Sequence, residues 1–150
     1  MATVTVADVL EHAERFEQML VGYYARLSEQ STREGVRLLT DYMSRHRRRI
    51  GKAMARLSSE QVKRVRSVPL RYEPQAADCR CFEATELLPG TTATEVLDAA
   101  VTFDECLVRL YRQVLEQPVD EEIKELFESF LRAEQRDEIE LKKIKATDYF

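Results

Sequence analysis

Two stretches of the sequence decide the fold: VLEHAERFEQMLVGYYARLSEQ at residues 9–30 and VLDAAVTFDECLVRLYRQVLEQ at residues 96–117. They align without a gap at a constant offset of 87 residues. Apolar residues recur in both at steps of three and four, which is the pattern of one buried face of an α-helix. Helical period alone does not explain identical aromatic residues and identical ends, so we predict two copies of one structural element. The matched identities include Phe16 with Phe103, Tyr24 with Tyr111, and Gln30 with Gln117.

The same offset continues beyond these two helices. It pairs Glu34 with Glu121, across the break that follows each helix. The repeated unit is therefore predicted to be a helical hairpin. We place the first copy at about residues 5–57 and the second at about residues 92–148.

Several residues predict where the helices begin and end. Thr5 is a favourable N-cap for the first helix, and Thr92 with Glu95 forms a capping box for the third. Ser58 to Gln61 also reads as a capping box, which predicts a short helix that Pro69 terminates. Pro118 is expected in the first turn of the fourth helix.

Residues 58–91 are predicted to form a long crossover between the hairpins. From about Ser67 to Thr91 the helical pattern fails and three of the four prolines occur. A helix of about 25 residues is roughly 37 Å long, and an extended connection of about 25 residues spans that length easily. The sequence therefore predicts one all-α domain over residues 1–150, a four-helix bundle of two antiparallel hairpins with a long crossover between helices 2 and 3.

The composition excludes several classes of protein. Hydrophobic residues make up 44% and charged residues 33%, as in a globular helical protein. A net charge of −4 argues against a protein that coats nucleic acid. No apolar run approaches the roughly 18 residues of a membrane span, and residues 1–8 lack the pattern of a secretory signal. We therefore expect a cytoplasmic protein with neither a membrane nor a nucleic-acid partner.

Two acidic residues stand at a characteristic distance from tyrosines. Glu17 precedes Tyr24 by seven residues, and the repeat places Asp104 seven residues before Tyr111. This spacing resembles the rubrerythrin and ferritin-like superfamily, in which each hairpin carries a Glu seven residues before an aromatic residue and a Glu-x-x-His on its second helix. The resemblance covers nearly the whole chain as a pattern and implies the ferritin-like bundle.

The second half of that family motif is incomplete. The fourth helix reads Glu134-Gln135-Arg136-Asp137, so Asp137 replaces the usual His. On the second helix the equivalent positions are Arg47 and Ile50. Arginine stays protonated and isoleucine has no donor atom, so neither binds a metal in the normal way.

These positions suggest a polar centre. An interior cluster of carboxylates repels itself, and a buried Arg offers charge balance and bidentate hydrogen bonds without a metal. Our hypothesis is that Arg47 replaces the metal as the organiser of this centre. One alternative is that the side chains lie on solvated faces and never converge; another is a mono- or dinuclear iron or manganese site on the four carboxylates. The expected members are Glu17, Arg47, Asp104, Glu134 and Asp137.

Three further features are weaker signals. His46 aligns with Ala133 in the repeat, which favours a flanking or solvent position. Cys79-Arg80-Cys81 could bind a soft metal or form a redox pair, but a lone Cys-x-Cys is a weak zinc signal. We therefore interpret Cys79 and Cys81 as ordinary thiols, and we expect Cys106 to be a half-buried residue that packs against its neighbours.

Charge is distributed unevenly along the chain. Residues 45–66 hold nine basic residues and one acidic residue, a net +8, whereas residues 118–140 hold three basic and nine acidic residues, a net −6. These faces are expected to complement each other between helices 2 and 4. The alternative is a basic surface that binds an acidic or phosphate-bearing partner.

The sequence thus favours a non-catalytic ferritin-like protein that has lost the usual di-iron site and acts by binding, regulation or assembly. No cofactor is expected, and the partner is an unidentified protein or a second copy in a homodimer. One alternative is a metal-dependent oxidase, peroxidase or iron-handling protein that uses the remaining carboxylates. Another is a basic-surface binding module.

Overall fold

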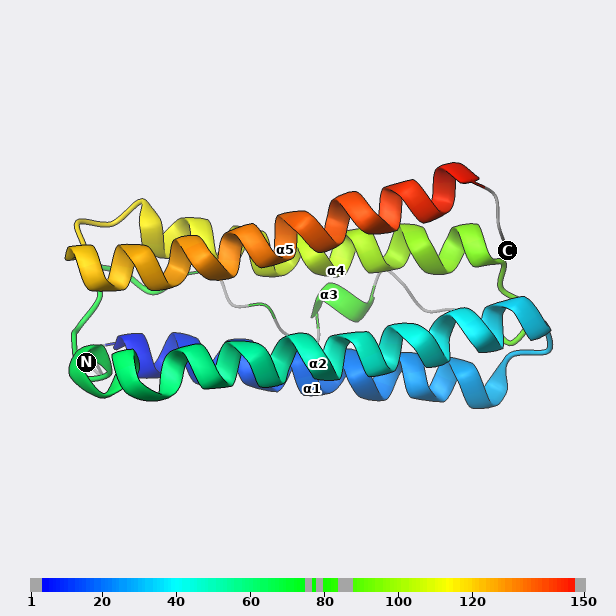
Figure 1. Cartoon of the computed structure of the whole chain (residues 1–150), viewed down its shortest axis with the longest axis horizontal. Coiled ribbons are helices and arrows are strands. Elements are labelled where there is room, and N and C mark those ends of the chain that lie inside the picture. The colour runs from blue at the N-terminus through cyan, green and yellow to red at the C-terminus, as the bar shows by residue number, and fades with distance from the viewer. Residues whose placement is uncertain (1–3, 75–76, 78–79, 84–87, 148–150) are drawn as a thin grey trace.

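The structure is a bundle of four long helices (Figure 1). This computed structural model describes residues 4–74, 77, 80–83 and 88–147, with the backbone alone at residues 57–62 and 83. Helices α1 and α2 form one hairpin, and helices α4 and α5 form the other. The predicted all-α, ferritin-like arrangement is confirmed. The helices are α1 (Val6–Gln30), α2 (Glu34–Val65), the short α3 (Arg80–Glu83), α4 (Ala93–Leu115) and α5 (Glu121–Thr147).

Matching helices begin 87 residues apart. Thr5 caps α1 and Thr92 caps α4, and each threonine forms a capping box with the residue three positions later. The Thr92 hydroxyl accepts a hydrogen bond from the backbone N–H of Glu95 at 3.2 Å. Helices α2 and α5 begin at Glu34 and Glu121. These starts agree with the offset of the repeat, while a gene duplication stays a prediction.

Two predicted helix boundaries are wrong. Helix α2 does not end near residue 57 but continues to Val65, so no separate helix begins at Ser58. Val65 is buried and no proline occurs before Pro69, so nothing in that stretch interrupts the helix. Pro118 lies before α5 and not in its first turn. Asp120 caps the helix instead, since its carboxylate accepts a hydrogen bond from the backbone N–H of Ile123 at 3.1 Å.

The crossover runs along the length of the bundle, as the sequence predicts. It begins beside the start of α1, where the N–H of Val6 donates to the carbonyl of Val68 at 3.0 Å. It finishes beside the turn after α1, where the N–H of Thr32 donates to the carbonyl of Pro89 at 3.0 Å. Helix α3, which the sequence pattern did not predict, lies in between (Figure 1). The second hairpin is therefore inverted relative to the first.

The core is built from large side chains of all four long helices. Phe16, Tyr24, Phe103 and Tyr111 are each at most 2% exposed. Burying a large apolar side chain contributes about 1.5–3 kcal/mol, so these residues fix the register in which the hairpins pack. Within the described part of the chain, no helix is long and apolar enough to cross a membrane.

Candidate functional site

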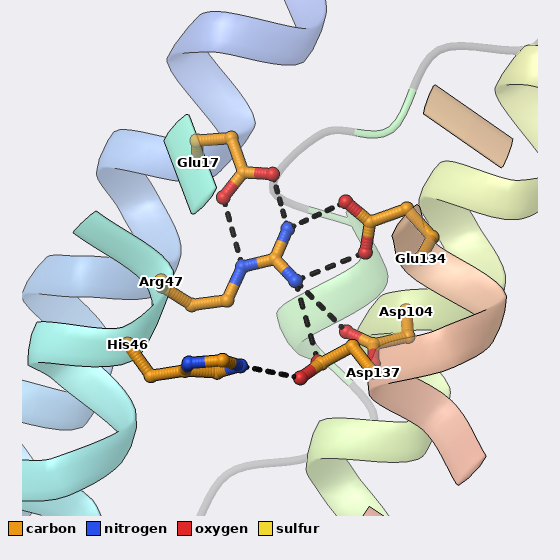
Figure 2. Close-up of polar contacts among 6 residues, drawn as sticks. All are labelled: Glu17, His46, Arg47, Asp104, Glu134 and Asp137. Carbon is orange, nitrogen blue, oxygen red and sulfur yellow. Dashed lines mark hydrogen bonds and ion pairs between the residues drawn. The ribbon is translucent and has the colours of Figure 1, made fainter. Parts of the chain in front are cut away.

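A polar cluster interrupts this apolar core. It comprises one side chain from each of α1, α2 and α4 and two from α5 (Figure 2). All five are at most 6% exposed. The side chains converge, so they do not lie on solvated faces. The cluster consists of Glu17, Arg47, Asp104, Glu134 and Asp137.

Arg47 is the common partner of the four carboxylates. Its Nε donates to Glu17 Oε2 at 2.8 Å, and its Nη2 donates to Glu17 Oε1. Glu134 receives a second bidentate pair, from Nη1 at 2.9 Å and from Nη2 at 2.8 Å. The planar fork of a guanidinium matches two carboxylates in this way. Arg47 therefore joins α1 to α5 through the middle of the bundle.

The two aspartates lie on the other edge of the guanidinium. Nη1 of Arg47 is 3.4 Å from Asp104 Oδ1 and 3.4 Å from Asp137 Oδ2. One nitrogen thus faces one oxygen from each of Asp104, Glu134 and Asp137. These contacts are longer than the pairs with Glu17 and Glu134, so the two glutamates hold the guanidinium and the aspartates complete its surroundings.

His46 flanks the cluster, which is one of the two positions predicted for it, and it contacts one of the cluster's members. Its Nε2 lies 2.8 Å from Asp137 Oδ1, and its ring stacks on Tyr42 with centroids 5.6 Å apart. The side chain is 33% exposed, so it connects the buried cluster to the surface. The alignment with Ala133 could not reveal the contact with Asp137, because the alanine side chain is too short to make an equivalent contact. Two features of the sequence could have indicated this contact. Asp137 stands where the family pattern has a histidine, and a histidine stands beside Arg47 on the other helix.

Burial and charge move the pKa values of the carboxyls in different directions. Burial raises the pKa of Glu17 to about 7, against the opposing charge of Arg47. Burial and the neighbouring Asp137 carboxyl raise the pKa of Asp104 well above its usual value. For Asp137, burial is outweighed by the hydrogen bonds of His46 and Asp104, so its pKa is lowered. The site therefore favours the protonated form of Glu17 and Asp104 and the ionised form of Asp137.

Two buried polar side-chain atoms in the described part of the chain have no hydrogen-bond partner there. They are Asp104 Oδ2 and the hydroxyl of Tyr111. Burial, and then the charges of Glu134 and Glu17, raise the pKa of Tyr111 well above its usual value. The pKa of Tyr24 is raised in the same direction by burial and by Asp104. Both tyrosines are therefore neutral phenols beside the cluster.

A metal centre needs several ligand atoms that can reach one cation together. Ligand atoms of Asp104, Glu134 and Asp137 lie within 4.8 Å of one another, which is close enough for one cation. However, Nη1 of Arg47 already contacts all three residues. Two unit charges 4 Å apart in a partly shielded site repel by about 4 kcal/mol, and a divalent ion doubles that figure. With Arg47 in place, these residues do not fit a di-iron centre.

Two cavities approach the cluster from different sides. One, of about 440 Å³, lies between α1 and α2 and is lined in part by Glu17, Arg47 and Gly51. The other, of about 70 Å³, is lined in part by His46 and Asp137. The centre is therefore buried but lies next to spaces that small molecules can enter.

Of the described cysteines, Cys81 and Cys106 take no part in the hydrogen bonds that join the polar cluster. Cys106 is buried rather than half-buried, at 8% exposure. Burial, together with a contact from the Cys81 thiol, raises the pKa of Cys106 to about 12. Cys79 lies outside the described residues. A thiol with so high a pKa is a poor nucleophile and a poor metal ligand at neutral pH.

The expected charge complementarity between α2 and α5 is concentrated inside the bundle. Its strongest contacts are those of Arg47 with Glu134 and Asp137. On the surface, Arg64 and Glu122 form an ion pair at 3.4 Å. An exposed pair of this kind contributes little to stability.

The helix order, the long crossover and the central carboxylates define the class: the chain has a ferritin-like fold. It is similar to a chain from Thermotoga maritima described as a ferritin-like diiron-carboxylate protein, with a TM-score of 0.64 and 20% sequence identity. The match covers 97% of each chain. No family model matches the sequence, and no curated protein matches it.

Proposed function

We propose that this protein is a non-catalytic member of the ferritin-like class that works without a metal and acts by binding a partner. The observation that carries the proposal is the contact of the Arg47 guanidinium with four carboxylates at the centre of the bundle. In this proposal Arg47 supplies the positive charge that cations supply in a di-iron centre.

The energetics support this role for Arg47. Four carboxylates in a dry interior would shift strongly toward the protonated form if no cation faced them. Glu134 and Glu17 raise the pKa of Arg47 well above its usual value, although burial acts in the opposite direction. The guanidinium is therefore charged at every pH at which the protein is folded.

Anaerobic titration with Fe(II) and Mn(II), followed by calorimetry, tests the proposal. We expect no stoichiometric binding by the wild-type chain and no iron or manganese in the purified protein by elemental analysis. Stoichiometric binding that disappears in Glu134→Ala would overturn it. Glu140→Ala is the matched control, because Glu140 is on the same helix and is exposed.

A second candidate is a metal-dependent oxidase, peroxidase or iron-handling protein. It is favoured by the unpartnered Oδ2 of Asp104 within the cluster of Asp104, Glu134 and Asp137. A metal there requires the Arg47 side chain to move away. The same titration separates the candidates, because this one predicts binding that becomes tighter when Arg47 is replaced by Gln.

A further inference from the structure

The cavity between α1 and α2 extends beyond the polar contacts of Arg47 and offers a second site. It occupies about 440 Å³ between α1 and α2, which is in the range of small-molecule sites, about 300–1,000 Å³. It extends along α1 from Ala7 to Val21. Fourteen residues at 1.5 Å each give a length of about 21 Å. The shape is therefore long and suits an extended ligand.

A glycine keeps this cavity open. Gly51 lies on the wall formed by α2, and a Cβ added there would be 3.9 Å from Cβ of Glu17, with no closer neighbour. Glycine in the middle of a helix costs about 0.5–1 kcal/mol relative to alanine. Neither a positive φ nor a close backbone approach requires glycine at this position. A larger side chain at this position would extend into the space beside Glu17.

The inner lining of the cavity is mostly apolar. Side chains from α1, α2 and α5 contribute to it, and Arg47 and Glu17 at its inner end are already bonded to each other. An anionic group at that inner end would face the Glu17 carboxylate. The inner part therefore suits a hydrocarbon rather than a charged group. Its apolar members include Leu10, Ala13, Val21, Met54 and Phe130.

Two cations stand at the exposed side of the cavity. Arg48 and Lys52 are four residues apart on α2, so they lie on one face of the helix. Neither forms an ion pair with any residue that the structure describes. Arg66, which also lines the cavity, has Glu11 at 3.9 Å. The exposed Glu14 lies on the α1 wall. Arg48 and Lys52 therefore offer two positive charges for a ligand.

We propose that the cavity between α1 and α2 binds a free, single-chain aliphatic carboxylate, with the chain against the apolar lining and the carboxylate at Arg48 and Lys52. This proposal goes beyond the metal-free role of Arg47. Its failure would leave that role intact, because the metal titration tests the role separately.

Calorimetric titration with dodecanoate, below its micelle concentration, tests the proposal. We expect binding of one molecule per chain. Gly51→Leu places a side chain in the cavity and should weaken binding at least tenfold. Gly51→Ala is the matched control and should bind within about twofold of the wild-type chain, because its Cβ makes only an ordinary contact. Circular dichroism of both variants checks that the helices are retained.

The charged end of the ligand is tested by variants that leave the interior untouched. Arg48→Gln combined with Lys52→Gln should weaken binding of dodecanoate about fivefold, since an exposed pair contributes up to about 1 kcal/mol. Glu14→Gln removes a nearby negative charge and should bind as tightly as the wild-type chain or more tightly. Dodecanol should bind more weakly than dodecanoate.

Four results would overturn the proposal. The first is no binding of dodecanoate, and the second is unchanged binding by Gly51→Leu. The third is tighter binding of dodecyltrimethylammonium than of dodecanoate. Retention on anionic phosphatidylglycerol vesicles without binding of free dodecanoate would also overturn it, because the cations would then be recognising a membrane surface.

Discussion

Replacing Arg47 by Met tests the central contact of the bundle most directly. Methionine keeps much of the side-chain length but removes the charge and the donors that face Glu17 and Glu134. Removing one partner of a buried ion pair costs about 3–5 kcal/mol, because the remaining charges stay buried without compensation. For a chain of 150 residues, each kcal/mol lowers the melting temperature by about 2–4 °C. The expected loss is therefore about 6–20 °C.

The assay is thermal and urea unfolding followed by circular dichroism between pH 4 and pH 8. Without the guanidinium, the pKa values of the folded-state carboxyls lie above those of the unfolded chain. The stability of the variant is then greatest below the unfolded pKa values, near 4, and is lost as the pH rises through the folded values. The difference in unfolding free energy from the wild-type chain should therefore grow from pH 4 to pH 8.

The matched control is Arg48→Met, the same substitution one residue along the helix. Arg48 is exposed, so its replacement should change the free energy of unfolding by no more than about 0.5 kcal/mol. Two results would refute the reasoning: a loss below about 1 kcal/mol for Arg47→Met at pH 8, or a loss that is the same at pH 4 and pH 8.

Three further predictions concern the same centre. Glu17→Gln should flatten the dependence of the unfolding free energy on pH, because the pKa of Glu17 is raised to about 7 in the folded chain. The contribution of Glu17 to stability is complete below about pH 4.5, and about 3 kcal/mol of it is lost as the pH rises to about 7. Parallel stability curves for the variant and the wild-type chain would contradict this. Tyr111→Phe removes a hydroxyl that has no hydrogen-bond partner among the described residues. Urea unfolding should therefore show an unchanged free energy of unfolding or a gain of up to about 1 kcal/mol. A loss of more than about 1 kcal/mol would mean that the hydroxyl forms a hydrogen bond. Arg47→Glu combined with Ile50→His restores the ligand types that the family pattern has on its second helix, and calorimetry should then detect Fe(II) or Mn(II) binding that the single variant Ile50→His lacks.

The helical register made much of the centre predictable from the sequence. Residues 87 apart occupy equivalent turns of matching helices, so Glu17 and Asp104 could be placed on inward faces without coordinates. The same arithmetic assigned Arg47 and Glu134 to equivalent positions on α2 and α5, and the structure joins them through two hydrogen bonds. The position of a residue in the helical repeat determines which side of the helix its side chain points to, and this can be worked out from the sequence alone.

Features that depend on the distance between helices were not predictable. His46 reaches Asp137 because of the way α2 packs on α5, and the repeat gave no guide since the equivalent Ala133 is too short to reach anything. The motif at Ser58 failed for a different reason. The residues of this motif are also tolerated inside a helix. The apolar repeat continues to the buried Val65, so α2 continues through the motif.

The counter-ion of this centre is a side chain. A guanidinium at position 47 is made with the polypeptide, in a fixed ratio of one per molecule, and no chelator can extract it. Its valence is constant, so the positive charge that Arg47 brings to the core does not change with the redox state of the surroundings. A single codon thus determines whether the four carboxyls of the bundle face a positive charge.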